Sequence, residues 1–104
     1  MKPLILAALC LGACATTPSP AKTVYETEGT YTAAALAENA YIHKPGADPI
    51  IVVRLRALDM DAYGRLVPLR MAARNGQAIS PSDLDVTISA VKTLADYESQ
   101  NGVR

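Results

Sequence analysis

Apolar residues recur at helical spacing along most of this chain, and the strongest such pattern lies in its middle. The positions are three or four residues apart, which places them on one side of a helix: Ile51, Leu55, Leu58, Ala62, Leu66, Leu69 and Ala73. Asp48 suits an N-cap and Pro49 the first helical position, while Asn75-Gly76 is a typical helix stop. The pattern predicts a helix that begins at Pro49 and ends close to Asn75.

Two features of this segment argue against a regular helix. The run Ile50-Ile51-Val52-Val53 is β-branched and would also suit a strand. Pro68 lies in the predicted interior, where its ring meets the carbonyl of the residue four positions earlier, which is Gly64. A proline with a glycine one turn before it favours a tolerated kink.

The segment before this helix also has helical character. Thr23-Val24-Tyr25-Glu26 fits a capping box, and the chain then contains no proline until His43-Lys44-Pro45-Gly46. The expected buried stripe is Val24, Tyr31, Ala35 and Ile42. Small residues at spacing four should let a neighbouring backbone approach closely: Gly29, Ala33 and Ala37. The pattern predicts a helix from Thr23 to Tyr41 or Ile42.

A third helix has the most complete start signal of the chain. Ser80 suits the N-cap, Pro81 the first position and Asp83 the third, while Ile79 and Leu84 can form a hydrophobic staple. Its expected buried residues are Leu84, Ile88, Val91 and Ala95, with Leu94 beside them. Asn101-Gly102 ends it. Short connections between three such helices predict an all-α fold, a three-helix antiparallel bundle within residues 23–104.

The middle helix has a second apolar set on the side away from the first. It consists of Val53, Met60, Tyr63, Val67 and Met71. In one interpretation the helix touches both neighbours, so that its apolar arc is wide and buried. In the other, part of the arc stays exposed and binds a partner protein, a second copy or the membrane.

Charge adds to the bundle prediction. Five arginines lie on the middle helix, between two helices rich in acidic residues: Arg54, Arg56, Arg65, Arg70 and Arg74. Their scatter on both flanks of the core stripe favours ion pairs between helices over a site for an anionic headgroup or polymer. The chain has 10 basic and 10 acidic residues and a pI near 6.5, which argues against a nucleic-acid partner.

Candidate chemistry is sparse. His43, the single histidine, lies at a helix end, where it is expected to cap carbonyls. Asp59 and Asp61 point to different sides of a helix and are expected on solvated surface, and the tyrosines are expected to pack between helices. The chain has no phosphate loop, nucleophile elbow or Cys/His ligand set. We therefore expect no catalytic residues, no metal and no cofactor. The hypothesis that the protein is a small enzyme or an enzyme subunit is the least favoured.

The start of the chain has the pattern of a targeting signal. Met1-Lys2 is followed by an apolar run from Leu4 to Leu11, too short to span a membrane, and then by Leu11-Gly12-Ala13-Cys14. This order resembles the signal peptide and lipobox of bacterial lipoproteins. The resemblance implies that residues 1–13 are removed and that Cys14 carries lipid on its sulfur, usually with an acyl chain on the new amino terminus. No free thiol would remain, since Cys10 is removed with the signal.

Residues 14–22 would then be the lipidated cysteine and a flexible tether, since they are small and contain proline. Ala15 follows the cysteine where aspartate would mark inner-membrane retention, so the resemblance implies an outer-membrane protein that faces the periplasm. We expect a non-catalytic envelope lipoprotein that acts through protein contacts. The folded part also resembles short uncharacterised lipoproteins of proteobacteria and prophages, which implies an alternative role in lysis or superinfection exclusion.

Overall fold

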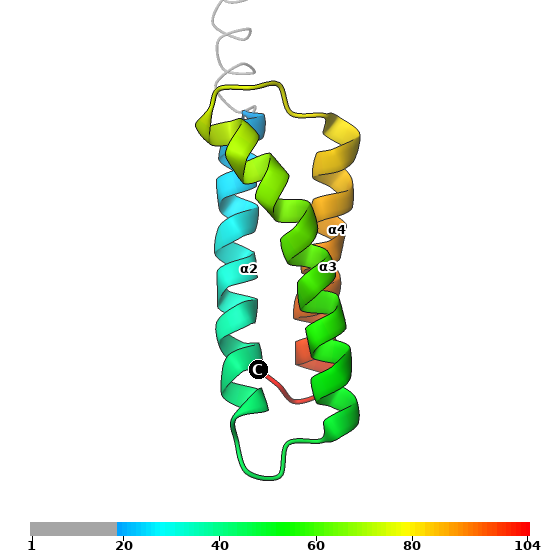
Figure 1. Ribbon diagram of the computed structural model, residues 1–104. Coiled ribbons are helices and arrows are strands. Elements are labelled where there is room, and N and C mark those ends of the chain that lie inside the picture. The colour runs from blue at the N-terminus through cyan, green and yellow to red at the C-terminus, as the bar shows by residue number, and fades with distance from the viewer. Residues whose placement is uncertain (1–18) are drawn as a thin grey trace, which may run out of the picture.

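The fold is a bundle of three helices, and the prediction of an all-α antiparallel bundle is confirmed. The computed structural model describes residues 19–104. Helix α2 comprises Pro20–Ile42, α3 comprises Pro49–Arg74 and α4 comprises Pro81–Gln100, and each helix packs on the other two. The chain runs down α2, up α3 and down α4 (Figure 1). The lipobox residues and Cys14 lie outside the described residues.

Each helix begins with the same device, a short polar N-cap followed by proline. The Ser19 hydroxyl accepts a hydrogen bond from the Lys22 amide at 3.2 Å, and the Asp48 carboxylate accepts one from the Ile50 amide at 2.9 Å. Ser80 accepts from the Asp83 amide at 3.4 Å. These side chains satisfy amide groups that the first turn leaves without a helical partner. The starts predicted at Pro49 and Pro81 are confirmed.

The predicted start of the first helix is wrong. Helix α2 begins at Pro20 rather than at Thr23, because Ser19-Pro20 supplies the same cap as the other two helices. Thr23 lies inside the helix, where its hydroxyl donates to the Ser19 carbonyl. The expected tether therefore loses its last three residues to the bundle.

The helix ends agree with the sequence. The His43 ring nitrogen Nδ1 lies 2.8 Å from the Asn39 carbonyl, which is the capping role expected of it. Gly76 and Gly102 adopt positive φ angles of 65° and 69° directly after the caps Asn75 and Asn101. That left-handed conformation lets the following amide bond back to the last turn, which ends the helix.

The core lies between the three helices in two connected parts. One part is built on Ala34, Tyr41, Leu55 and Leu94, the other on Val24, Leu66 and Leu69, and Tyr31 packs against both. The core stripe predicted for α3 is confirmed, since all seven of its residues are buried or half-buried. Helix α3 is continuous through Pro68. It also contains residues 50–53, so the alternative interpretation of these residues as a strand is wrong.

The predicted stripes of the outer two helices are partly wrong. In α4 the buried side chains are Thr87, Val91, Leu94 and Glu98, while Ile88 is 37% exposed. In α2 they are Val24, Thr27, Ala34, Glu38 and Tyr41. Gly29 has no neighbour within 4 Å of where a Cβ would lie, so the expected close backbone approach is absent there. The errors share one cause, since polar residues occupy core positions and apolarity alone pointed to their neighbours.

Candidate interaction surface

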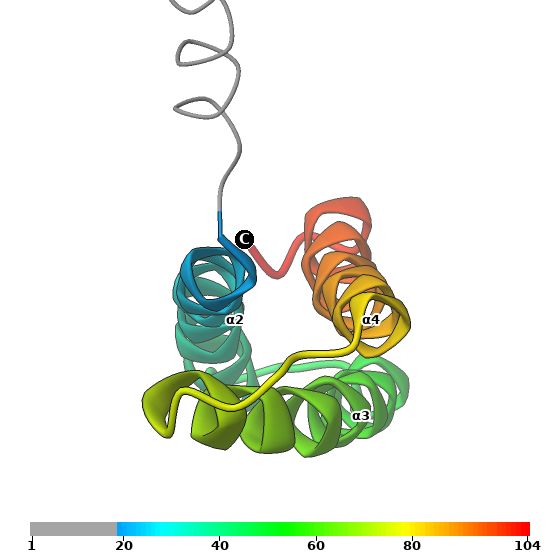
Figure 2. The same ribbon diagram turned by 90° about the horizontal axis from the view of Figure 1, so that it is seen from above.

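The outer face of α3 is apolar and exposed. Helix α3 lies along one side of the α2 and α4 pair, and no described element covers its far side (Figure 2). The side chains of Val53, Met60 and Met71 are exposed by 69%, 74% and 56%, and Tyr63 by 49%. Val67 is half-buried. The interpretation in which this second set is simply buried between neighbours is therefore wrong, and the set forms a surface.

The surface is longer and more regular than the sequence reasoning recognised. Three more small or apolar residues continue it. Together with Val53, Met60, Val67 and Met71 they occupy positions 50, 53, 57, 60, 64, 67 and 71, while Tyr63 lies on the flank of this row. The additional members are Ile50, Ala57 and Gly64, all exposed. The spacings alternate between three and four, which is the a/d pattern of a coiled-coil seam. We call these seven residues the outer seam. The signal is present in the sequence, but Ile50 also belongs to a β-branched run, and Ala57 and Gly64 are too small to stand out as apolar positions.

The outer seam and the core stripe lie on about opposite sides of the helix. At 3.6 residues per turn, the mean direction of positions 50, 53, 57, 60, 64, 67 and 71 is about half a turn from that of the core residues. A helix with one buried stripe and a solvated back is sufficient for a small bundle. A second complete seam exceeds that need and is typical of a helix with a further partner.

Charged residues flank the outer seam on both sides. Toward α2 lie Arg56, Tyr63 and Arg70, and Arg70 donates to the Glu28 carboxylate of α2 at 2.9 Å. This contact confirms the predicted ion pairing between helices for one arginine. On the other flank lie Arg54 and Asp61, where Asp61 accepts from Arg65 at 3.1 Å through one carboxylate oxygen. Arg54 is exposed and forms no ion pair within residues 19–104.

A set of carboxyl groups lies inside the bundle, on the opposite side of α3 from the outer seam. Glu38 of α2 is 7% exposed and Glu98 of α4 is fully buried. Glu38 Oε1 and both carboxyl oxygens of Glu98 have no hydrogen-bond partner, and the nearest cation to Glu98 is Arg104 at 4.0 Å. Asp59 of α3 completes the set and accepts a hydrogen bond from the Tyr31 hydroxyl. The expectation that Asp59 lies on solvated surface is wrong.

Burial raises the pKa of Glu98 from 4.5 to about 7, with the negative charge of Asp59 adding to the effect and Arg104 opposing it. Burial also raises the pKa of Glu38 to about 7, and the charges of Asp59 and Glu98 act in the same direction. Tyr31 has its pKa raised by burial and by its bond to Asp59. Of these three groups, the carboxyls of Glu38 and Glu98, with pKa values of about 7, are the ones that exchange protons near neutral pH. Within residues 19–104, no three His, Cys, Asp or Glu side chains are arranged to hold a metal ion.

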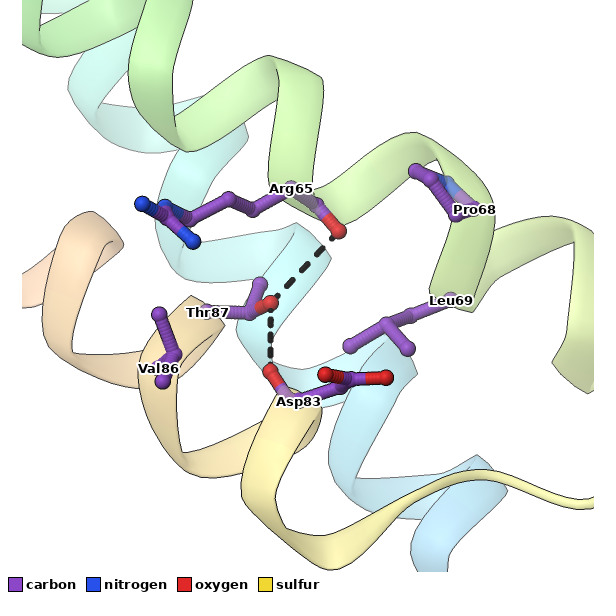
Figure 3. Close-up of a pocket in the computed structure, with 6 residues that line it drawn as sticks. All are labelled: Arg65, Pro68, Leu69, Asp83, Val86 and Thr87. Carbon is purple, nitrogen blue, oxygen red and sulfur yellow. Dashed lines mark hydrogen bonds between the residues drawn. The ribbon is translucent and has the colours of Figure 1, made fainter.

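Two hollows lie at other helix junctions. One, of about 280 Å³, lies between α3 and α4 beside Pro68, with Thr87 projecting into it (Figure 3). The Thr87 hydroxyl lies 2.8 Å from the Asp83 carbonyl and 3.5 Å from that of Arg65, so its polar group is satisfied locally. The other, of about 340 Å³, lies between α2 and α4, lined in part by Thr27, Ile88 and Val91. Among the described residues, the buried polar side-chain atoms without a hydrogen-bond partner belong to Glu38 and Glu98, and neither residue lines these hollows.

The chain matches no known family model, no curated protein and no solved structure. None of the described helices combines the length and apolarity that a membrane crossing requires. The outer seam is therefore identified by its geometry alone.

Proposed function

We propose that this protein is a lipid-anchored envelope protein without catalytic activity, which acts through protein contacts made by the outer seam of α3. The observation that carries the proposal is the exposure of an a/d seam opposite the core. Five of the seven outer-seam positions carry large apolar side chains. Their contact with water raises the free energy of the protein, and a partner that covers them lowers it.

The resemblance of Leu11-Gly12-Ala13-Cys14 to a lipobox supports the anchor. Removal of residues 1–13 would leave Cys14 at the amino terminus, five residues before the N-cap Ser19 of α2. Five extended residues span at most about 18 Å. The bundle would then lie close to the membrane that holds the lipid, which confines its partners to the same surface. Ala15 after the cysteine favours the outer membrane, with the bundle facing the periplasm.

The anchor is tested by Cys14→Ser in the full chain. The thiol accepts the lipid, so the variant should lose labelling by a fatty-acid analogue and leave the membrane pellet. Separation of the two membranes of a diderm host on a sucrose gradient tests the location, and co-migration with inner-membrane markers contradicts the outer-membrane assignment. Continued labelling of Cys14→Ser contradicts the anchor.

The contact surface is tested separately by Met60→Glu. This change places a carboxylate in the middle of the outer seam, where the wild-type side chain faces solvent, and should abolish crosslinks formed in native membranes without lowering stability. Leu36→Glu is the matched control, because Leu36 is 67% exposed on α2, away from the seam. Crosslinks that survive Met60→Glu and disappear in Leu36→Glu contradict the assignment of the surface.

A further inference from the structure

We propose that the outer seam docks on the same seam of a second copy, with the two α3 helices antiparallel and with Ala57 and Met60 at the two-fold axis. The inference rests on the proposed function, in which this seam makes the contacts. It adds the identity of the partner, its orientation and its register.

When two outer seams pack on each other, the combined size of the facing side chains stays similar from layer to layer only if the helices are antiparallel. In that arrangement a positions face d positions of the other helix. Ile50 then meets the partner's Val67, Val53 meets the partner's Gly64, and Ala57 meets the partner's Met60. Each of the two small residues, Ala57 and Gly64, faces a larger side chain. A parallel pair would place alanine on alanine and glycine on glycine on the two sides of a layer of paired Met60 side chains, which leaves voids beside a crowded layer.

The charges beside the seam agree with the same register. On one flank Arg54 faces the partner's Asp61, and on the other Arg56 faces the ring of the partner's Tyr63. Both contacts occur twice because of the two-fold symmetry. Arg54 is exposed and has no competing ion pair among the described residues, and Asp61 uses only one carboxylate oxygen for Arg65. Arg54 of one copy, which has no ion pair within residues 19–104, thus matches the carboxylate oxygen of the partner's Asp61 that Arg65 leaves free.

Other antiparallel registers bring like charges together. A shift of one heptad toward Met71 places Asp61 against the partner's Asp61 and Arg56 against the partner's Arg70. A shift in the other direction places Arg54 against the partner's Arg54. Like charges at these flanking positions oppose association and select the register. The selected register uses positions 50–67 and ends before Pro68, so it does not require the segment after the proline to remain straight.

No other part of the bundle obstructs this docking, because α2 and α4 both lie on the far side of α3 (Figure 2). The α2 start lies at the same end of the bundle as the α3 end (Figure 1). An antiparallel pair therefore has its two tethers at opposite ends. Two short tethers reach one membrane only if the helices lie along the membrane plane, and this geometry follows from the pairing.

The experiment uses two differently tagged full-length copies, coexpressed in the same cells, with cysteine at Ile50 in one copy and at Val67 in the other. These positions are about 25 Å apart along a helix, so they approach each other only in an antiparallel pair. We expect a disulfide between the two tagged copies under mild oxidation, and none when either variant is expressed alone. Leu36→Cys serves as the control on α2 and should give no dimer.

The outcomes separate this inference from the proposed function. A disulfide between two copies that both carry Ile50→Cys indicates a parallel pair and overturns the antiparallel assignment. Seam cysteines that crosslink only to a different protein overturn the second copy as partner, yet leave the proposed function intact. Seam cysteines that crosslink to nothing overturn both.

Charge exchange provides a second measurement. Arg54→Asp places two carboxylates opposite each other at each end of the pair and should lower the crosslinked fraction roughly tenfold at low salt. The double variant Arg54→Asp with Asp61→Arg restores opposite charges and should restore the crosslinked fraction. Equal crosslinking in the single and double variants would overturn the register.

Discussion

The Tyr31 hydroxyl donates a hydrogen bond to Asp59 Oδ1 at a distance of 2.5 Å. This bond joins α2 to α3 at the boundary between the two parts of the core. Tyr31 packs against both parts, so its ring and its hydroxyl act at one junction. Hydrogen bonds to a charged acceptor are stronger than neutral ones. Together with the ion pair between Arg70 and Glu28, this contact therefore fixes the register of α2 and α3.

Tyr31→Phe should lower the free energy of unfolding by about 1 to 3 kcal/mol, since it leaves a half-buried carboxylate without its donor. Urea denaturation of residues 19–104 measures the change. Tyr25→Phe is the control, because Tyr25 is 47% exposed and donates no side-chain hydrogen bond among the described residues. Equal stability of the two variants would show that Asp59 finds another donor.

Stability should fall as pH rises from about 4.5 toward 7. Folding raises the pKa values of Glu38 and Glu98 from 4.5 to about 7, so in that window the folded state binds more protons than the unfolded state. The stabilisation is complete below the unfolded pKa and is lost as the pH passes the folded pKa. Thermal unfolding at pH 5 and pH 8 should give the higher midpoint at pH 5.

Glu98→Gln isolates the contribution of one buried carboxyl. The amide keeps the shape of the side chain and cannot ionise, so the variant should be more stable than the parent at pH 8 and should show a weaker pH dependence. Glu26→Gln changes an exposed carboxyl of α2 and should leave the profile unchanged. A profile for Glu98→Gln that matches the parent would contradict the assignment of the raised pKa to Glu98.

The two faces of α3 should respond differently to truncation. Leu55→Ala removes a fully buried side chain from the core and should cost about 2 to 5 kcal/mol. Val53→Ala, two positions away on the outer seam, should change stability by less than about 0.5 kcal/mol in the monomer. Denaturation of dilute residues 19–104 measures both. A similar cost for the two variants would contradict the exposure of the seam.

Sequence reasoning succeeded where apolar spacing and helix caps agreed. The α3 core stripe and the starts at Pro49 and Pro81 followed from local rules, since a short polar cap before proline has few other uses. The start of α2 was missed because Thr23 and Glu26 also form a valid capping motif, and sequence alone does not say which of two caps is used. Ser19-Pro20 has the form of the other two caps, so comparison within the chain could have found it.

The interior carboxyls could not have been predicted from spacing. Glu38 and Glu98 are charged residues at helical core positions, and the ordinary rule places such residues in solvent. Their burial depends on which side of α2 and α4 faces α3, a tertiary property. The outer seam was partly predicted, since Val53, Met60, Val67 and Met71 follow from the apolar spacing, but its exposure depends on the same tertiary arrangement.

Pro68 offers a test of why α3 contains a proline at all. The missing amide proton leaves the Gly64 carbonyl without its helical donor, and the Thr87 hydroxyl approaches the adjacent Arg65 carbonyl at 3.5 Å (Figure 3). Pro68→Ala restores the donor and should stabilise residues 19–104 by about 1 to 2 kcal/mol, less than the full interior cost of proline because the unfolded chain also gains freedom. Urea denaturation measures the gain, with Pro45→Ala in the connection between α2 and α3 as the control. A destabilised Pro68→Ala would show instead that α3 must bend at this point to pack on both neighbours.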